Sequence, residues 1–280
     1  IGKYPQLAKG ILRNLISNIN DTELTYVVEG RNWSIRQDGL AITNVLNKSK
    51  LIKSAISHTH IGARNQILHF GSVNTYFHRC TWEPIHTSNK VVMTWFHVKP
   101  DDSRLAKIKD EQRIDLIHTS CSQTKQILVS AGVPEQKITV IPLGVDLDLF
   151  RPAQENEKNR LQESLGIPED KFVIGSFQKD GEGWGEGMEP KWVKGPDVFI
   201  KSLEQLQREK LFVLLTGPAR GYVKNELTRL GIPFKHIFLK KFKDIAPLYR
   251  ALDLYIIASR VEGGPKAILE SWASGVPVVS

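Results

Sequence analysis

Two patterns of hydrophobic and polar positions alternate along the second half of the chain. Short runs that are apolar at nearly every position, such as residues 211–216, predict buried strands. Between them, apolar positions three or four residues apart predict helices. This alternation is typical of βαβ units, in which helices cover both faces of a parallel sheet. We expect strands at 171–177, 211–216, 236–239, 254–258 and 276–279, and helices at 196–208, 224–230, 245–252 and 265–273.

The first half repeats this pattern less regularly. Its expected strands are 24–28, 66–70, 91–96, 114–119 and 138–141, and its expected helices are 7–19 and 124–131. A polar and charged segment at residues 151–160 separates the two halves. We therefore predict an α/β protein with two Rossmann-like domains, residues 1–150 and 151–280. Parallel sheets of this kind bind ligands at the carboxyl ends of their strands, so we expect a cleft between the two domains.

Composition narrows the class of protein. The chain has 280 residues, of which 41% are hydrophobic and 24% charged, which excludes a disordered or fibrous protein. Its apolar runs are much shorter than the ~20 residues of a membrane span. Two cysteines argue against a disulfide framework and favour a reducing compartment, so we expect a cytoplasmic location. The chain begins with Ile1 and ends in a strand-like segment, so we expect that both ends are cut.

The net charge of +8 is spread over both halves. It favours anionic ligands such as phosphates, or peripheral contact with an acidic membrane surface, and it is too dispersed to indicate nucleic acid. The histidines lack the spacing of a metal site, and no Asp pair is placed to hold a metal on a diphosphate. We expect neither a metal nor a cofactor.

A glycine-rich turn follows the expected strand 254–258 and leads into a helix. Glycines let the backbone approach a ligand closely, and the amides of a helix start attract anions. The predicted phosphate site consists of Gly263, Gly264, Pro265 and Lys266. In the same helix we expect Ile268, Leu269, Trp272 and Ala273 to be buried.

Two carboxylates, Glu262 and Glu270, flank this helix start. They would repel a phosphate unless they bind something else, and sugar hydroxyls are suitable partners. A nucleotide sugar, with phosphates between two polyols, fits this arrangement. In the alternative interpretation Glu262 is a solvated loop residue, and Lys266 and Glu270 form an exposed helical pair.

Glu262 and Glu270 enclose seven residues, and with the flanks 259–260 and 273–279 they resemble the E-x7-E signature of the family-four retaining glycosyltransferases. Residues 137–146, followed by Phe150 and Pro152, resemble that family's segment before the interdomain linker. The resemblance implies a GT-B fold, in which residues 1–150 hold the acceptor and residues 151–280 the donor. It further implies metal-independent transfer of a sugar, with retention, from a nucleotide diphosphate sugar to an acceptor hydroxyl.

The resemblance also assigns roles to single residues. Lys194 would neutralise the donor diphosphate, and Lys179 would replace an arginine that the family carries at the position of Ser176. Glu262 would orient the sugar hydroxyls and Glu270 the ribose hydroxyls. The remaining assignments are Gly217 beside the donor, after strand 211–216, and His97 facing the reacting sugar. Each lysine could instead be an ordinary surface residue, and His97 could be satisfied by backbone bonds at a strand end.

Some features leave alternatives open. The glycine-rich loop at 180–187 is longer than the family's and is interpreted as a flexible surface insertion or an acidic lid; its glycine spacing does not fit a dinucleotide fingerprint. Leu143 and Ser176 depart from the family pattern, which keeps a noncatalytic nucleotide-binding or scaffold protein as the alternative. The sequence does not fix the donor base, the sugar or the acceptor. The basic surface suits a carbohydrate or lipid-linked acceptor.

Overall fold

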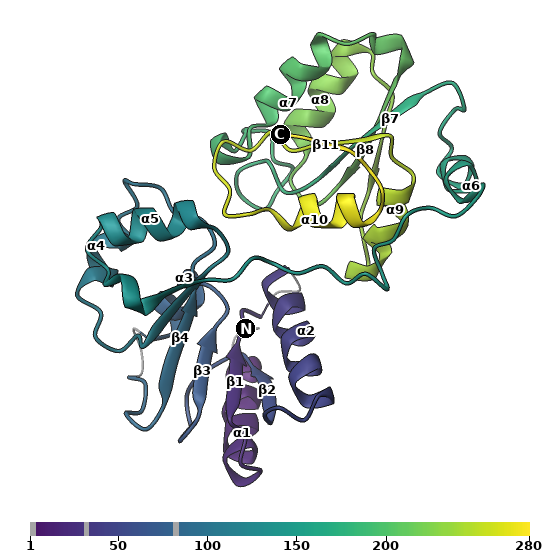
Figure 1. Cartoon of the computed structure of the whole chain (residues 1–280). Helices are drawn as coiled ribbons and strands as arrows, with labels where there is room; N and C mark the ends of the chain where they lie inside the picture. The colour runs from purple at the N-terminus through teal and green to yellow at the C-terminus, as the bar shows by residue number, and fades with distance from the viewer. Residues whose placement is uncertain (1–3, 31–33, 81–83) are drawn as a thin grey trace. The chain divides into compact units, whose positions relative to one another are not determined.

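The computed structural model describes residues 4–30, 34–80 and 84–280. The chain forms two compact units, residues 1–142 and 143–280, which are described separately (Figure 1). The boundary follows Pro142, whereas the sequence placed it after Phe150. The reason is that Phe150 is 1% exposed and packs in the core of the second unit, with its ring centre 5.9 Å from that of Tyr249.

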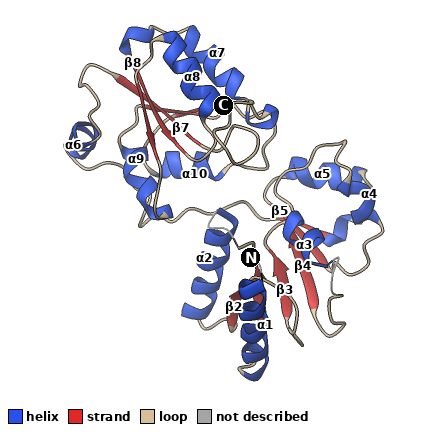
Figure 2. Ribbon diagram, turned by 180° about the vertical axis from the view of Figure 1, so that it is seen from behind, coloured by secondary structure: helices blue, strands red, loops and turns tan. Residues whose placement is uncertain are grey.

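The described part of the first unit has one parallel sheet with the strand order β2-β1-β3-β4-β5-β6 (Figure 2). The strands are β1 (Leu24–Val27), β2 (Ser54–Ser57), β3 (Ile67–Phe70), β4 (Lys90–Thr94), β5 (Leu116–Thr119) and β6 (Ile138–Val140). The helices are α1 (Tyr4–Ile19), α2 (Ser34–Lys48), α3 (Val73–Cys80), α4 (Arg104–Lys109) and α5 (Ser122–Ser130), with a 3₁₀ turn η1 (Glu135–Lys137).

Several elements of this unit have no clear signal in the sequence, namely α2, β2, α3 and α4. Helix α2 shows why: its fully buried residues are Gly39 and Thr43, while apolar residues such as Leu40 and Leu46 are only half-buried. Gly39 is required because a Cβ there would lie 2.6 Å from the Tyr26 ring. The helix therefore makes its closest contact through a glycine, and Leu46 adds an apolar contact to the cluster that contains Tyr26.

The second unit has a parallel sheet with the order β11-β10-β7-β8-β9. The strands are β7 (Phe172–Phe177), β8 (Leu211–Thr216), β9 (Phe234–Ile237), β10 (Leu254–Ile256) and β11 (Val278–Val279). The helices are α6 (Glu157–Ser164), α7 (Pro196–Glu204), α8 (Gly221–Leu230), α9 (Ala246–Arg250) and α10 (Lys266–Ala273), with 3₁₀ turns η2 (Trp192–Lys194), η3 (Arg208–Lys210) and η4 (Phe242–Ile245).

The expected elements of this unit are confirmed, with small shifts at their ends. Strand β8 is buried at all of its positions, as a strand covered on both faces should be. Helices α7 and α8 pack together on one face of the sheet, and α9 and α10 contact each other on the opposite face (Figure 1). Together with the parallel pairing, this layering confirms a Rossmann-like α/β arrangement in the second unit, and the parallel sheet of the first unit agrees with the same class.

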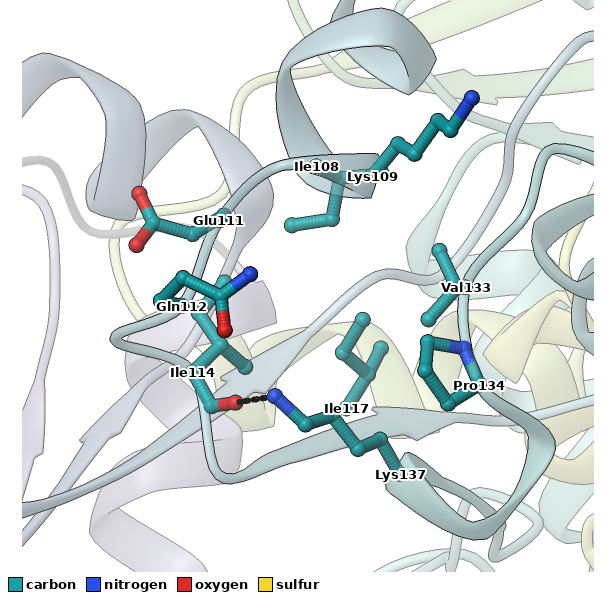
Figure 3. A pocket seen from close by; sticks show the side chains of 9 residues that line it. All are labelled: Ile108, Lys109, Glu111, Gln112, Ile114, Ile117, Val133, Pro134 and Lys137. Atoms are coloured by element: carbon teal, nitrogen blue, oxygen red, sulfur yellow. Dashed lines mark hydrogen bonds between the residues drawn. The ribbon is translucent and has the colours of Figure 1, made fainter.

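A small cavity of about 150 Å³ lies in the first unit, near the amino end of β5 (Figure 3). Its wall includes Ile108, Ile114 and Val133, and Lys137 Nζ donates a hydrogen bond to Ile114 O at 3.0 Å. None of the site residues predicted from the sequence lines this cavity. Among the described helices, none combines the length and the apolar character that crossing a bilayer requires.

Candidate functional site

The strand order of the second unit marks one place on the sheet where ligands are expected to bind. From β7 the chain continues to β8 and β9 on one side, and then returns to β10 and β11 on the other side. The loops after β7 and β10 therefore lead to opposite faces of the sheet, and open α/β sheets bind ligands at such a point, beside the carboxyl ends of their strands. The predicted residues Lys194 and Glu262 lie in the connections that follow these two strands.

Lys194 and Glu262 form an ion pair at this switch point, with Lys194 Nζ 2.5 Å from Glu262 Oε1. The side chains are 25% and 19% exposed, so both charges are partly shielded and still reachable from solvent. Lys194 ends the turn η2, and Glu262 lies four residues before α10. The structure thus brings together a cation and a carboxylate that the sequence places far apart.

The two loops are fixed to each other on both sides of this pair. Gly195 has φ 58°, and a Cβ there would lie 1.9 Å from the carbonyl oxygen of Ala258, so the backbones touch. The Arg260 N–H donates to Val193 O at 3.0 Å. The Arg260 guanidinium also donates to both carboxylate oxygens of Asp197, at 2.8 and 2.6 Å. Arg260 is therefore a positioning residue, which the sequence analysis did not identify.

The predicted phosphate turn leads directly into α10. Gly263 is buried, and Gly264 has φ +85°, a conformation that favours glycine. Pro265 precedes the helix as its N-cap residue, and α10 begins at Lys266, one residue later than predicted. The Lys266 ammonium lies 5.8 Å from the centre of the Phe242 ring, in η4. The start of α10 is thus next to η4, at the carboxyl edge of the sheet.

Glu270 lies on the buried side of α10. Its side chain is 5% exposed, and Tyr249 Oη donates a hydrogen bond to Glu270 Oε2 at 3.0 Å. Burial raises the pKa of Tyr249 well above its usual value, so this phenol stays protonated and remains a donor. The interpretation of Glu270 as half of an exposed helical pair is therefore wrong.

The expected apolar stripe of α10 is also partly wrong. Trp272 is 63% exposed, whereas Ser271 and Ser274 are buried with Glu270. The helix turns this polar side inward because Glu270 accepts from Tyr249 and Ser271 Oγ donates to Val276 O at 3.0 Å. These two bonds satisfy polar groups that burial would otherwise penalise.

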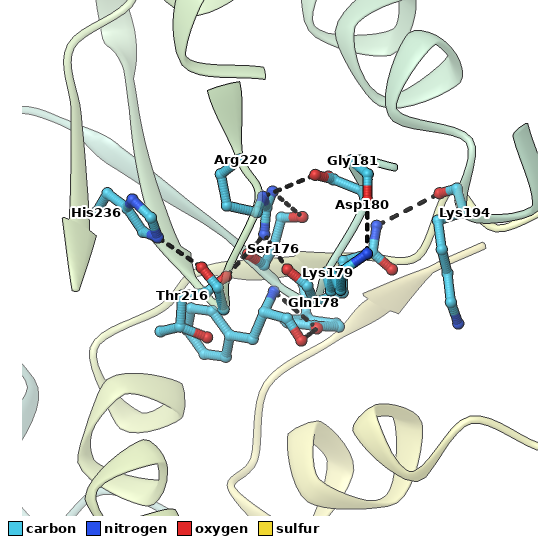
Figure 4. A network of polar contacts seen from close by, with 12 residues as sticks. Ser176, Gln178, Lys179, Asp180, Gly181, Lys194, Thr216, Arg220 and His236 are labelled. Carbon is cyan, nitrogen blue, oxygen red and sulfur yellow. Dashed lines mark hydrogen bonds and ion pairs between the residues drawn. The ribbon is translucent and has the colours of Figure 1, made fainter. Parts of the chain in front are cut away.

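Arg220 organises the ends of β7 and β8 (Figure 4). Its side chain is 0% exposed, and one guanidinium nitrogen donates to the carbonyls of Ser176, Gln178 and Thr216 at 2.7, 3.0 and 2.9 Å. Another donates to Ser176 Oγ at 3.0 Å, and Nε lies 3.0 Å from Asp180 Oδ1. Arg220 thus fills the space beside Ser176, where the resemblance implies an arginine, and this role was not predicted from the sequence.

Lys179 and Gly217 lie beside this network. Lys179 Nζ donates to Gly181 O at 2.8 Å and lies 5.1 Å from the centre of the Trp184 ring. Burial, and then the nearby Lys191, lower the pKa of Lys179. Gly217 has φ +89°, and a Cβ there would lie 2.4 Å from Gln178 O. The loop after β8 can therefore approach the loop after β7 only because residue 217 is glycine.

The glycine-rich insertion is an anchored hairpin. Gly181 and Pro190 form an antiparallel bridge, and the carbonyls of Glu186 and Gly187 accept hydrogen bonds from the first two amides of α8, Gly221 and Tyr222, at 2.6 and 2.9 Å. These carbonyls cap the start of α8. The segment lies at the surface, since residues 182–186 are exposed, and its carboxyl end is fixed to the start of α8. Its flexibility, as an insertion or as a lid, stays a prediction.

In the first unit, the predicted residue His97 is exposed in the loop after β4, and its carbonyl accepts a hydrogen bond from Trp95 Nε1 at 3.2 Å. A network of the buried Thr94 with the half-buried His69 and His118 lies on the same sheet edge. Thr94 Oγ1 lies 2.8 Å from His69 Nε2 and 3.1 Å from His118 Nδ1. Burial, and then His118, lower the pKa of His69 to about 3, so His69 is neutral near pH 7.

Within the described ranges, no group of three or more His, Cys, Asp or Glu side chains is arranged to hold a metal ion. Metal-independent catalysis, like the roles of the individual site residues, stays a prediction.

Comparison with known proteins identifies relatives that match the second unit and more of the chain. Residues 185–280 match the family model described as "Glycosyl transferases group 1". The chain is 26% identical over 196 residues to a D-inositol 3-phosphate glycosyltransferase of Corynebacterium jeikeium, covering 65% of this chain and 44% of that protein. A second such enzyme, of Catenulispora acidiphila, is 27% identical over 219 residues, covering 70% and 48%. The chain thus spans about half the length of these curated relatives.

Solved structures show the same fold. Anabaena HepE in complex with UDP and glucose matches with a TM-score of 0.69 and 17% identity, covering 92% of this chain and 80% of that one. WaaG, a glycosyltransferase involved in lipopolysaccharide biosynthesis, matches with a TM-score of 0.62 and 13% identity, covering 91% and 80%. These findings confirm the GT-B fold and the resemblance to glycosyltransferases, while the E-x7-E motif stays a prediction.

Proposed function

Because the chain has the GT-B fold and its second unit matches the group 1 glycosyl transferases, we propose that it transfers a sugar from a nucleoside diphosphate sugar to an acceptor hydroxyl. We further propose that the anomeric configuration is retained and that no metal takes part. The observation that carries this proposal is the Lys194–Glu262 pair, which lies beside the start of α10 at the switch point of the second sheet.

The positive groups at this edge suit a departing diphosphate. As the bond between the sugar and the phosphate breaks, negative charge grows on the phosphate oxygens. Lys194 and the start of α10 would stabilise that charge, and Lys179 would add a second cation from the loop after β7. Lysine offers a point charge and not the planar fork of arginine, so the glycine turn before α10 carries more of the binding.

The carboxylates suit the two polyols of the donor. Glu270, which Tyr249 holds in place, would accept hydrogen bonds from the ribose hydroxyls, and Glu262 would orient the hydroxyls of the transferred sugar. The bond from the anomeric carbon to phosphate breaks as the bond to the acceptor oxygen forms. The acceptor proton passes to the leaving phosphate, so the chain needs no nucleophile. His97 is the proposed contact from the first unit to the reacting sugar.

The relatives suggest which substrates to try first. HepE binds UDP and glucose, so UDP-glucose heads the donor panel. The named curated relatives are D-inositol 3-phosphate glycosyltransferases, so a polyol phosphate heads the acceptor panel, followed by carbohydrate and lipid-linked acceptors. We also propose peripheral contact with a membrane, where a lipid-linked acceptor would be found.

The alternative is a noncatalytic nucleotide-binding protein, and one observation favours it. The serine in place of the family arginine is bonded to the buried Arg220, and Lys179 bonds to its own loop, so neither is directed at a ligand in the described geometry.

Thermal shift with UDP, GDP and ADP sugars, followed by an assay for release of nucleoside diphosphate with the acceptor panel, separates the two functions. We expect one sugar nucleotide to raise the melting temperature and to be turned over in excess EDTA. Binding without turnover would favour the noncatalytic alternative, and failure of every sugar nucleotide to bind would refute both. Loss of turnover in EDTA that Mn²⁺ restores would contradict only the metal-free mechanism.

A further inference from the structure

Helix α1 of the first unit buries its polar side. Gly10 is buried, and a Cβ there would lie 2.8 Å from Thr59 Cγ2, so the helix packs closely on the segment after β2. Asn14 Nδ2 donates to the carbonyls of Thr59 and Ile61 at 2.9 and 2.8 Å, and Asn18 Nδ2 donates to Gly62 O at 2.7 Å. Small and polar residues thus hold α1 against the unit.

The opposite side of α1 is an exposed apolar stripe. Its members are Leu12, Leu15, Ile16 and Ile19, which are 60%, 48%, 48% and 80% exposed. They are spaced three or four residues apart, so they line one face of the helix. A surface helix normally turns its apolar stripe to the core, and α1 has the reverse arrangement. Single exposed leucines need no explanation, whereas a continuous stripe of this length indicates a binding surface.

Basic residues border this stripe. Lys9 and Arg13 are exposed on α1, and no acidic residue occurs between positions 4 and 19. At the end of the helix, Lys53 Nζ donates to Asn20 O at 3.3 Å, so the segment before β2 lies next to the end of α1. That segment adds Leu51, which is 71% exposed, and Lys50, which is also exposed. Apart from the exposed Asp21 and Glu23 just beyond the helix, the border of this apolar surface is cationic.

We propose that the α1 stripe lies in the interfacial region of a membrane that contains anionic lipids. An interfacial helix combines an apolar face, which enters the acyl boundary, with lysine and arginine beside it, which meet acidic headgroups. A second copy of the chain packed on this stripe would bring the like charges of both borders together, because a twofold interface uses the same patch twice. The cationic border therefore fits an anionic bilayer better than it fits a second copy of the chain. This proposal locates the membrane contact and stands independently of the transfer reaction.

Co-sedimentation with lipid vesicles tests this proposal. The protein is mixed with vesicles of phosphatidylcholine alone and with vesicles that also contain phosphatidylglycerol. We expect binding to the anionic vesicles that weakens at high salt. The double variant Leu12→Gln and Ile19→Gln should bind at least tenfold more weakly, because it removes apolar area. Glutamine forms helices nearly as well as leucine, so circular dichroism should show an unchanged helix content.

Leu147→Gln is the matched control, since Leu147 is 69% exposed in the second unit, and it should bind the anionic vesicles like the unchanged chain. Absence of binding to anionic vesicles, or equal binding by the double variant, would overturn the proposal. Light scattering that shows a dimer which only the double variant dissociates would overturn it as well, in favour of a second copy of the chain.

Discussion

At the residue scale, two ion pairs near the carboxyl edge of the second sheet differ in whether they can contact a ligand. The Arg220 and Asp180 side chains are 0% and 1% exposed, and Arg220 is also bonded to three backbone carbonyls. Burial raises the pKa of Asp180, and Arg220 opposes that shift. This pair can only support the loops. The Lys194–Glu262 pair is partly exposed, so it can exchange its internal contact for a ligand.

The His69 network of the first unit gives a pH prediction. The folded-state pKa of His69 is about 3, against 6.5 for an unperturbed histidine, so the unfolded chain binds a proton that the folded chain does not. The associated stability is present above pH 6.5 and is lost as the pH falls toward 3. We expect the free energy of unfolding to fall by up to about 1.4 kcal/mol per pH unit in this window.

Urea denaturation at pH 7, 6, 5 and 4 measures this loss, with His69→Phe as the comparison. Phenylalanine keeps a ring beside Tyr26, whose ring centre lies 4.5 Å from that of His69, and removes the titrating group. The variant should be less stable than the unchanged chain at pH 7, with a shallower pH dependence. Parallel pH profiles for the two proteins would contradict the assigned pKa.

At the scale of elements, the site depends on close contacts between loops. The loop after β8 touches the loop after β7 at Gly217, and the loop after β10 touches η2 at Gly195. These contacts set the spacing between Lys194, Glu262 and the start of α10. The anchored hairpin at 181–190 adds a third contact, through the first amides of α8.

Gly217→Ala tests this coupling, because the new Cβ would meet Gln178 O at 2.4 Å. Gly231→Ala is the control: Gly231 has φ 69°, and a Cβ there would meet nothing within 4 Å. Both substitutions cost about 1–2 kcal/mol for a left-handed alanine. We expect Gly217→Ala to cost further stability and to weaken binding of the donor identified by thermal shift at least tenfold. Equal effects of both variants in denaturation and calorimetry would show that the loop contact has no role.

At the scale of the whole molecule, the strands and helices that could be predicted from the sequence were those that bury apolar side chains. The sheet of the second unit was predictable because β7 and β8 are apolar and buried on both faces. Helix α2 was not, because it packs through Gly39 and Thr43. The same reasoning misplaced Trp272, since polar bonds, and not hydrophobicity, set the rotation of α10.

The residues of the candidate site also divide into those that the sequence predicted and those that it did not. Glu262, Glu270 and Lys194 were predicted from motif and resemblance, and the structure places them at one edge of the second sheet or in the adjoining helix. Arg220 and Arg260 were not predicted, because their roles depend on backbone carbonyls and a carboxylate that only folding brings near. Residues that act through long-range contacts leave no local pattern in a single sequence.

The central claim is that the second unit binds a nucleoside diphosphate between Lys194 and Glu270. Isothermal calorimetry with UDP, or with the diphosphate that thermal shift selects, measures it most directly. Lys194→Ala and Glu270→Gln should each weaken binding at least tenfold, since a hydrogen bond to a charged group contributes about 1.5–3 kcal/mol. Glu204→Gln on α7, a half-buried carboxylate that pairs with Arg229 and lies outside the proposed site, is the control and should bind like the unchanged chain. Unchanged affinity in both site variants would contradict the account.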